Sequence, residues 1–410
     1  MRKKILLVTP KFPYPPSGAD EADRAAGLEI LLRLGFDVYV ISKVYAESYK
    51  AEAVRVAKEL GTTIVPITYK YLYLRTWRQK VWHGLKRCLT PWYPDGAAYE
   101  YTEPEIQQAV TKALDSFKPD LVWFDYTFLW PLYRQVRKRH IPIVTRSCNF
   151  EPAHFLEEEG RTLFNYVRSI AKLITEYTTV RWSDFLFAIT PLEERTYRRL
   201  GAKHSATLPL RSLPRLLTAP VHDAQRSGPL NVFFSGSTYN VPHNRKALEF
   251  FLAQIIPAAQ RQFPGQFEFH IFGGKVPEQF KKYFVNGVVN HGYLDLGEFN
   301  ELMERMDVAV VPSLFGAGMQ QKIFEPLCRG IPTITSARGM AGYPFQDHAH
   351  LLLAENAPAF VRCLGELRDP KRRQELSVNA RALAQKLFSS TAIEEKVHSV
   401  LQPLFSGKAI

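Results

Sequence analysis

The sequence has few of the residues that build crosslinks, metal sites or membrane spans. Its four cysteines form no CxxC pair and lie far apart, at Cys88, Cys148, Cys328 and Cys363. This argues against a disulfide framework or a zinc site and fits a reducing compartment. No apolar run approaches the roughly 20 residues that cross a bilayer, and residues 5–8 are too short for a signal-peptide core. We expect a cytoplasmic protein, soluble or peripheral on the inner face of the membrane.

Acidic residues are outnumbered, and unevenly so. The chain has 53 Lys and Arg against 40 Asp and Glu, a net charge of +13. Residues 1–215 carry 33 basic and 23 acidic residues, whereas residues 216–410 carry 20 and 17. This asymmetry predicts an anionic partner for the first half.

Residues 69–94 have no acidic side chain, but they contain six Lys or Arg and seven Tyr or Trp. Basic residues interleaved with Trp and Tyr are typical of an anionic membrane interface. The alternative is a helix pair that packs its aromatic rings on the first domain and exposes its basic groups. Nucleic-acid binding is not expected, because no nucleic-acid-binding motif accompanies these residues.

Short apolar segments rich in β-forming residues alternate with helical stretches throughout the chain. We predict strands at 4–10, 36–42, 62–67, 120–125, 141–147 and 185–190, then at 231–236, 267–273, 288–294, 307–313, 332–336 and 350–354. Near-continuous apolar strands with helices between them indicate parallel sheets covered on both faces. The predicted fold class is α/β, with two doubly wound, Rossmann-like domains facing across a cleft.

A region without clear periodicity separates the two alternating halves. Residues 211–229 hold three prolines and a glycine and are interpreted as a linker. The first domain then covers residues 1–210 and the second covers residues 230–390. Residues 391–410 are predicted to form a C-terminal helix, which either packs back on the first domain or docks elsewhere.

The most informative segment runs from residue 306 to residue 336. It predicts a buried strand, a turn with Gly316 and Gly318, a short helix and a second buried strand. Free N–H groups at such a helix start favour a phosphate. Lys322 adds charge for a diphosphate, and Glu325 could accept hydrogen bonds from ribose hydroxyls. The alternative is an ordinary βαβ unit in which Lys322 and Glu325 form a surface pair of ~0.2–0.5 kcal/mol.

Four segments together resemble the GT-B glycosyltransferases, and within them the family-4 group of retaining, nucleotide-sugar-dependent enzymes. These segments are residues 10–42, RSCNFE at 146–151, residues 233–251, and GAGMQQKIFEPLCRGIPTITSARGMAGY at 316–343. The resemblance extends in order over nearly the whole chain. It implies a donor held by the second domain, an acceptor held by the first, and sugar transfer with retained configuration.

The resemblance also implies the partners. The donor is expected to be a nucleotide-diphosphate sugar, and the acceptor a saccharide or a lipid-linked saccharide in surface polysaccharide or glycoconjugate biosynthesis. Such enzymes usually need no bound metal, so neither a metal nor another cofactor is expected.

Matching the family motif position by position, Lys322 would neutralise the donor diphosphate and Glu325 would hold the ribose. Arg245 or Lys246 could supply a second positive group. The donor-binding residues predicted in this way are Gly236, Ser237, Arg245, Lys246, Gly316, Gly318, Met319, Gln320, Lys322 and Glu325.

The first domain supplies the remaining candidates. Gly18 is expected to line the acceptor side of the cleft by resemblance, and Asp125 and His154 by their places near strand ends. Catalytic roles are predicted for Lys322, Cys148, Asn149 and Glu151. An inverting enzyme would need a general base, for which Asp125, Glu151 and His154 are the candidates.

Two positions depart from the family pattern. Ala317 stands where many members carry a Glu that orients the transferred sugar, and Cys148 stands where the related segment has His. A thiol is a poor substitute for imidazole in hydrogen bonding. Two rival hypotheses therefore stay open, a nucleotide-sugar 2-epimerase of the same two-domain fold and a catalytically impaired binding protein.

Overall fold

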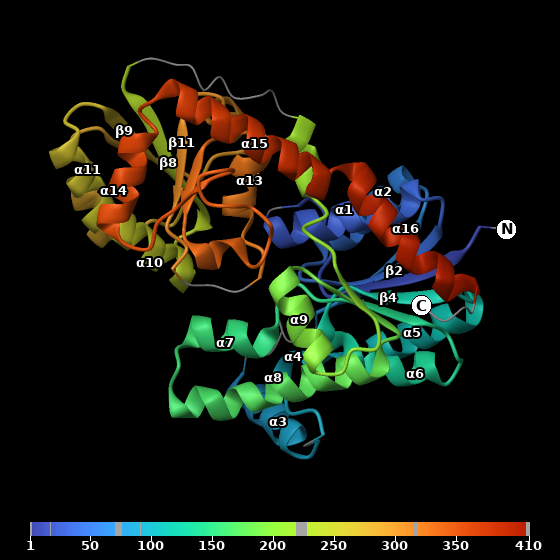
Figure 1. Cartoon of the computed structure of the whole chain (residues 1–410). Coiled ribbons are helices and arrows are strands. Elements are labelled where there is room, and N and C mark those ends of the chain that lie inside the picture. The colour runs from blue at the N-terminus through green and yellow to red at the C-terminus, as the bar shows by residue number, and fades with distance from the viewer. Residues whose placement is uncertain are drawn as a thin grey trace. The chain divides into compact units, whose positions relative to one another are not determined.

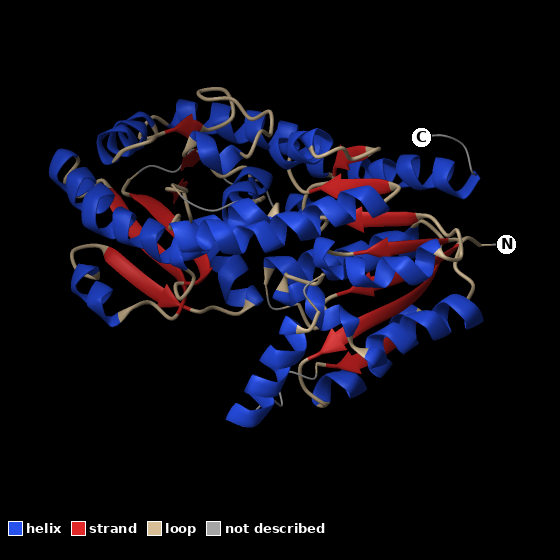
Figure 2. Ribbon diagram, turned by 90° about the horizontal axis from the view of Figure 1, so that it is seen from below, coloured by secondary structure: helices blue, strands red, loops and turns tan. Residues whose placement is uncertain are grey.

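The protein forms two compact units in a computed structural model, which describes residues 2–16, 18–69, 76–90, 92–218, 228–314 and 318–406. The first unit comprises Met1–Ser212 and Ile393–Ile410, and the second comprises Leu213–Ala392. Helices flank the strands of the sheet in each unit (Figure 2).

The first unit is built on a seven-stranded sheet with the order β3-β2-β1-β4-β5-β6-β7. Every neighbouring pair of strands in it is parallel. Its strands are β1 (Lys4–Thr9), β2 (Asp37–Val44), β3 (Thr63–Thr68), β4 (Leu121–Phe124), β5 (Ile143–Arg146), β6 (Phe185–Ala188) and β7 (Ser205–Thr207).

Helices precede and follow these strands (Figure 1). They are α1 (Ala19–Arg33), α2 (Ser48–Leu60), α3 (Trp77–Cys88), α4 (Gly96–Tyr99), η2 (Glu100–Thr102), α5 (Pro104–Ser116), η3 (Thr127–Leu132), α6 (Tyr133–Arg137), α7 (Glu151–Glu159), α8 (Leu163–Trp182) and α9 (Pro191–Arg199).

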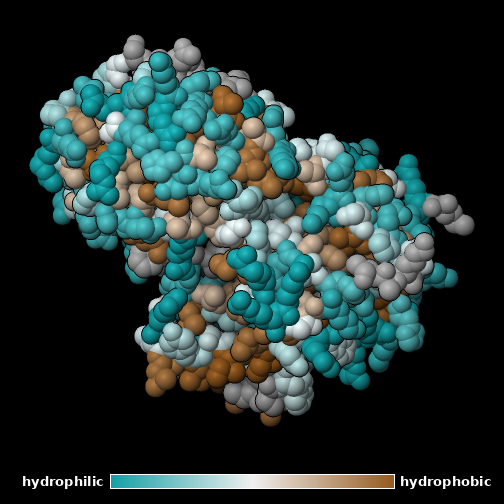
Figure 3. All heavy atoms as spheres, viewed as in Figure 1, coloured by the Kyte–Doolittle hydropathy of each residue, from teal (hydrophilic) through white to brown (hydrophobic). Residues whose placement is uncertain are grey.

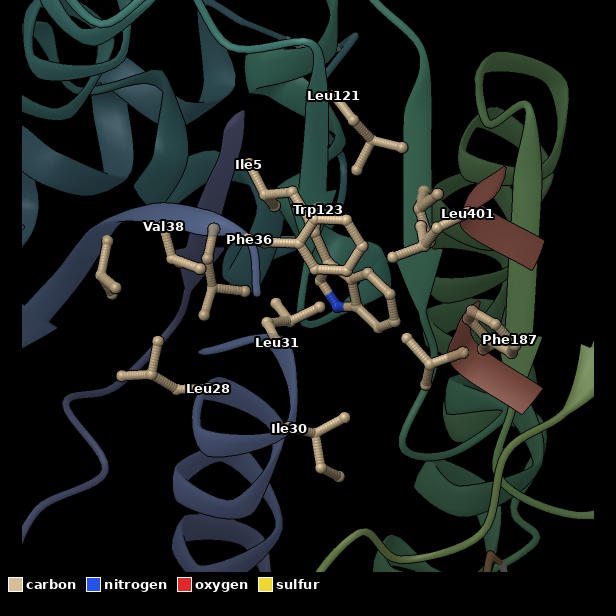
Figure 4. Close-up of a cluster of buried hydrophobic side chains, with 14 of the residues drawn as sticks. Ile5, Leu28, Ile30, Leu31, Phe36, Val38, Leu121, Trp123, Phe187 and Leu401 are labelled. Atoms are coloured by element: carbon tan, nitrogen blue, oxygen red, sulfur yellow. The ribbon is translucent and has the colours of Figure 1, made fainter. Parts of the chain in front are cut away.

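Strand alternation divides the apolar side chains of this sheet between two cores. Along β4, Leu121 and Trp123 enter one core, while Val122 and Phe124 enter the other. The first core includes side chains of α1 and α2, and the second includes side chains of α5, η3 and α6. Trp123 lies within the first core, with its ring 5.4 Å from that of Phe187 (Figure 4). Both faces are buried, which explains the near-continuous apolar strands.

The last helix, α16 (Ser390–Ser406), completes the first core from the far end of the sequence. Val397 and Leu401 are buried there with residues of α1 and β2. The ring of Phe405 lies 5.5 Å from that of Phe36. The first unit is therefore discontinuous in sequence.

The second unit is built on a six-stranded sheet with the order β10-β9-β8-β11-β12-β13, and its strands are also parallel. These strands are β8 (Leu230–Thr238), β9 (Phe267–Gly274), β10 (Val288–Gly292), β11 (Val308–Val311), β12 (Thr333–Thr335) and β13 (Leu352–Leu353). The predicted α/β class with two parallel-sheet domains is confirmed.

The helices of the second unit include one π-helical turn, η5. They are η4 (Leu213–Thr218), α10 (Pro242–Phe250), η5 (Phe251–Ile255), α11 (Ile256–Gln262), η6 (Glu278–Tyr283), α12 (Leu296–Met303), α13 (Gln321–Arg329), η7 (Ala337–Met340), α14 (Ala357–Glu366) and α15 (Pro370–Phe388). Residues 213–218, part of the predicted linker, form η4 and pack on α13 and α15. Residues 219–227 of that linker lie outside the described residues.

Each sheet reverses its strand order once, between β1 and β4 in the first unit and between β8 and β11 in the second. In doubly wound sheets, ligands bind at the carboxyl ends of the strands at such a reversal. Within the described part of the chain, no helix is long and apolar enough to cross a membrane.

We expect Leu401→Ala to lower the free energy of unfolding of the first unit by ~2–5 kcal/mol, because it leaves a cavity under α16. All six tryptophans lie between residues 77 and 182, so tryptophan fluorescence in urea follows this unit. The exposed Val54, changed to Ala, is the control and should shift the value by no more than ~0.5 kcal/mol. Equal effects of the two variants would contradict the packing of α16.

Candidate functional site

In the second unit, the strand reversal brings together two segments that the sequence analysis singled out. Gly236 and Ser237 lie at the end of β8, and α13 follows the neighbouring strand β11. The backbone is tightly packed here. A Cβ at Gly273, whose φ is 135°, would lie 2.0 Å from the carbonyl oxygen of Gly236. The ring of Tyr239 packs against both glycine positions, so neither could carry a side chain without a shift of its neighbours.

Lys322, the second residue of α13, is half-buried at this edge. Its Nζ donates to Asn244 Oδ1 at 2.7 Å, and Asn244 Nδ2 donates to the carbonyl oxygen of Thr238 at 3.0 Å. Among the described residues, no carboxylate forms an ion pair with Lys322. Burial without a compensating charge lowers the pKa of Lys322 to about 8. The site therefore contains an ammonium group held in place by a neutral amide.

The N-terminus of α13 adds backbone donors beside this ammonium. Gln320 is the N-cap residue, and its side chain does not cap the helix. Its Oε1 instead accepts from Ser313 Oγ at 2.7 Å. The first N–H groups of a helix have no intrahelical partner and carry the positive end of its dipole. Together with Lys322, they form an arrangement that favours an anion.

Glu325 does not pair with Lys322, so the simple surface-pair interpretation of this helix is wrong. Its carboxylate accepts from Arg329 at 3.1 Å and from Gln321 at 3.3 Å. Arg329 in turn donates to Asn300 at 2.7 Å. A carboxylate has about four lone-pair sites, so Glu325 keeps acceptor capacity for a hydroxyl pair. Its ribose role stays a prediction.

The other predicted donor residues differ in their exposure. Arg245 and Lys246 are exposed on α10, and Ser237 is exposed at the end of β8. Met319 is buried, with its sulfur 3.4 Å from the hydroxyl of Tyr343. Gly318 has a φ of 72°, in the left-handed region that glycine adopts readily. Gly316 and Ala317 lie outside the described residues.

In the first unit, the carboxylate predicted at the end of β4 is engaged by other groups. Asp125 accepts from Trp123 Nε1 at 2.8 Å and from Arg211 at 3.1 Å. Arg211 also binds Asp23 at 2.8 Å, and Asp23 binds Arg146 at 2.9 Å. Burial raises the pKa of Asp23, but the two guanidinium groups outweigh it and hold that pKa below its usual value. A substrate at Asp125 would have to compete with Arg211.

Gly18 and the segment after β5 lie close in sequence to members of this buried network. Gly18 precedes α1 with an extended backbone, φ −162°. Burial raises the pKa of the Cys148 thiol well above its usual value, so the group is a neutral thiol. The carbonyl oxygen of Asn149 accepts from Ser147 Oγ at 2.8 Å. His154 Nε2 lies 3.5 Å from Glu158, and its buried Nδ1 has no hydrogen-bond partner within the described residues.

Glu151 belongs to a buried acidic cluster that the sequence analysis did not predict. It accepts from the hydroxyl of Tyr126 at 2.8 Å, and its backbone N–H donates to Glu176 at 3.2 Å. Burial, followed by the charge of Glu151, raises the pKa of Glu176 to about 8. Burial also raises the pKa of Glu193 to about 7.

Both missed glutamates have a signal in the sequence. Glu176 is the only acidic residue in the 20 residues of α8. Glu193 stands three residues after Thr190, which is the spacing of a capping box. Its side chain instead accepts from the backbone N–H of Phe150 at 2.9 Å, and so holds the segment that contains Cys148 and Asn149.

Comparison with known proteins bears on the second unit in particular. Residues 229–369 match the model of the family described as "Glycosyl transferases group 1". The chain carries a glycosyltransferase domain. The strand reversal with Gly236 and Lys322 lies inside the matched region of this glycosyltransferase. No curated sequence matches the chain.

Solved structures resemble this glycosyltransferase over its full length. A sucrose-phosphate synthase from Thermosynechococcus elongatus has a TM-score of 0.69 at 18% identity, covering 99% of this chain and 100% of the other. Anabaena HepE in complex with UDP has a TM-score of 0.68 at 13% identity, covering 97% and 99%. TarM has a TM-score of 0.67 at 11% identity, covering 99% of both chains. At these identities the likeness shows the fold.

The predicted GT-B fold and the resemblance to glycosyltransferases are confirmed. The narrower likeness to the family-4 group stays a prediction. The predicted roles of individual site residues also stay predictions in this glycosyltransferase.

The buried glutamates predict an unusual pH dependence of stability. Glu176 binds its proton more tightly in the folded protein, where its pKa is about 8, than in the unfolded chain, where the pKa is near 4.5. Stability should therefore fall as the pH rises from about 5 to 8, with a slope of at most about 1.4 kcal/mol per pH unit from this group. Glu176→Gln should flatten the slope measured by denaturation at several pH values. The exposed Glu159→Gln is the control, and a slope unchanged by Glu176→Gln would contradict the assignment.

Proposed function

We propose that this glycosyltransferase moves a sugar from a nucleotide-diphosphate sugar to a saccharide or lipid-linked acceptor. The observation that carries the proposal is the half-buried ammonium of Lys322, which lies at the start of α13 and is held by the amide of Asn244. A diphosphate would supply the negative charge that the described residues do not place beside this ammonium group. The structures of Anabaena HepE with UDP and with UDP-glucose support a nucleotide-sugar donor.

The chemistry needs positive charge at the leaving group. When the bond between the sugar's anomeric carbon and the diphosphate oxygen breaks, negative charge develops on the nucleotide diphosphate. Fixed donors aimed at developing charge supply a large part of enzymatic rate acceleration. We assign this role to Lys322 and the free N–H groups of α13, without a metal ion. Arg245 or Lys246 on α10 is the candidate for a second cation.

Donor recognition is proposed to continue along α13. Glu325 lies one turn after Lys322 and is oriented by Arg329 and Gln321. A carboxylate held in this way is preorganised to accept from both ribose hydroxyls. Gly236 and Ser237 would let the end of β8 approach the diphosphate closely.

We further propose that the configuration at the transferred carbon is retained. An inverting reaction needs a general base beside the acceptor hydroxyl. Asp125 is engaged by Arg211 and Trp123, and Glu151 accepts from the Tyr126 hydroxyl and lies 3.8 Å from Lys172. These contacts favour the carboxylates as fixed structural groups over mobile bases, and so support retention.

The setting of the reaction is part of the proposal. We place the enzyme in the cytoplasm at the inner face of the membrane, where it would act in the biosynthesis of a surface polysaccharide or glycoconjugate. The excess of basic residues in the first half supports an anionic partner there, such as an acceptor carried on a lipid diphosphate.

Lys322→Ala should weaken the binding of UDP by roughly 10- to 100-fold in calorimetry, because one charge-assisted hydrogen bond is lost. Lys386→Ala, an exposed lysine on α15, is the matched control and should leave the affinity unchanged. Equal affinity of wild type and Lys322→Ala across a panel of nucleotide diphosphates would contradict the donor-site assignment.

The same titration repeated at different pH values gives a second readout. A diphosphate raises the pKa of Lys322 from its value of about 8, so binding takes up a proton above that pH. The wild-type affinity should therefore fall as the pH rises from 7 to 9. The arginine of the Lys322→Arg variant stays charged over this pH range. The affinity of this variant should therefore not show the fall that deprotonation of Lys322 causes in the wild type.

Product analysis separates the remaining hypotheses. With a donor panel and a mixture of lipid-linked and free saccharides, we expect transfer products whose anomeric proton coupling in NMR matches that of the donor. Opposite anomers would overturn retention. Conversion of the donor sugar without any acceptor would favour an epimerase. Donor binding without turnover, with turnover gained in Cys148→His, would favour an impaired binding protein.

A further inference from the structure

Helix α8 is amphipathic in the inverted sense. The side that packs on the first unit is mostly polar, with Asn165, Ser169, Thr175, Glu176 and Thr179 all buried. The opposite side is apolar and exposed. We call it the apolar face of α8, and it consists of Leu163, Phe164, Tyr166, Val167, Ile170, Leu173, Ile174 and Tyr177.

Specific hydrogen bonds fix this orientation. Glu176 accepts from the hydroxyls of Tyr197 at 2.9 Å and Thr127 at 3.0 Å. Thr179 Oγ1 donates to the carbonyl oxygen of Thr127 at 2.7 Å. Rotating α8 to bury its apolar face would break these bonds and expose a carboxyl that is neutral when buried. The helix is thus held with its apolar face outward.

The apolar face is large for a solvated helix. Leu163 is 82% exposed, Phe164 70% and Val167 60%. Figure 3 shows brown side chains gathered along the lower edge of the first unit, where Figure 1 labels α8 and α3. A contiguous exposed apolar surface of this kind marks an interaction site.

Helix α3 supplies a second group of exposed apolar side chains. Trp77, Val81, Trp82 and Leu85 are each more than half exposed. The chain beyond α3 is tied to α8, since Asp95 pairs with Lys172 at 2.9 Å and accepts from Thr175 at 3.2 Å. The segment that follows α3 is therefore anchored on α8.

The exposed charged side chains on α8 and α3 themselves are all basic. The sole carboxylate of α8 is Glu176, which is fully buried, while Arg168 and Arg181 are exposed. Residues 76–94 contain no acidic residue, and Arg78, Lys80 and Lys86 are exposed on α3. On the neighbouring helix α7, Glu157 and Glu158 lie near Arg161 and His154, respectively.

We propose that the apolar face of α8, together with α3, docks on the surface of an anionic lipid bilayer. Apolar side chains would enter the boundary between headgroups and acyl chains, Trp and Tyr rings would lie at headgroup level, and the cations would meet anionic headgroups. A second copy of the chain fits less well, because two such faces would bring like charges together with no exposed carboxylate on either helix. The proposal deepens the proposed placement at the inner face of the membrane, and its test does not depend on the sugar-transfer reaction.

Flotation tests this surface. The full chain should float with vesicles of phosphatidylcholine and phosphatidylglycerol at low salt, and less so at high salt or with phosphatidylcholine alone. Replacing Val167, Ile170 and Ile174 together by Asp should abolish flotation. The matched control replaces three exposed apolar residues elsewhere, Val54, Leu192 and Val378, by Asp and should float as the wild type does.

A charge variant gives an independent measurement. Replacing Arg78, Lys80 and Lys86 by Gln should lower vesicle affinity by roughly 100-fold and reduce its salt dependence. Circular dichroism and UDP binding should be unchanged in all variants, which separates this test from the donor site. No flotation of the wild type at low salt would overturn the proposal. So would a dimer in light scattering that the Asp variant of α8 converts to a monomer.

Discussion

Parallel strands joined by right-handed connections impose one constraint on each sheet of this protein. β1 lies between β2 and β4, and β8 lies between β9 and β11, so the chain must leave the central strand toward one face and return on the other. In the first unit, α1 and α5 accordingly belong to the two opposite cores. In doubly wound sheets the loops after such strands diverge, which is why ligands bind there. Gly236 lies at the end of β8, Asp125 directly follows β4, and Lys322 lies in the helix that follows β11.

The charged groups at the two strand reversals differ in their partners. In the first unit, Asp23 and Asp125 are matched by Arg146 and Arg211 in a fully buried network. Removing one member would leave an uncompensated charge in the interior, so these residues maintain the fold. Lys322 has a neutral amide for its partner and a pKa lowered by burial, and buried groups perturbed in this way are candidates for functional sites. This difference makes Lys322 a stronger candidate for a ligand-binding group than Asp125.

Patterns of local residues predicted the strands well. Each of the twelve predicted segments overlaps a strand, while β7 was missed because Ser205–Thr207 has no apolar pattern. Side-chain partners were much less predictable. Spacing left a pair between Lys322 and Glu325 open as the alternative, but Lys322 bonds Asn244, which is 78 residues away. Asp125 similarly meets Arg211 across 86 residues. Helical periodicity can reveal two sides of α8, but the polar groups of η3 and α9 decide which side turns inward.

The late return of α16 to the first unit has a consequence for synthesis on the ribosome. When residue 212 emerges, the sheet of the first unit is complete, but one face of it still lacks Val397 and Leu401. The whole second unit must be made before that face can close. The nascent first unit therefore exposes apolar surface while some 180 further residues are translated, whereas the second unit can fold as one continuous insertion. Chaperone demand during translation should accordingly fall on the part of the chain that is made first.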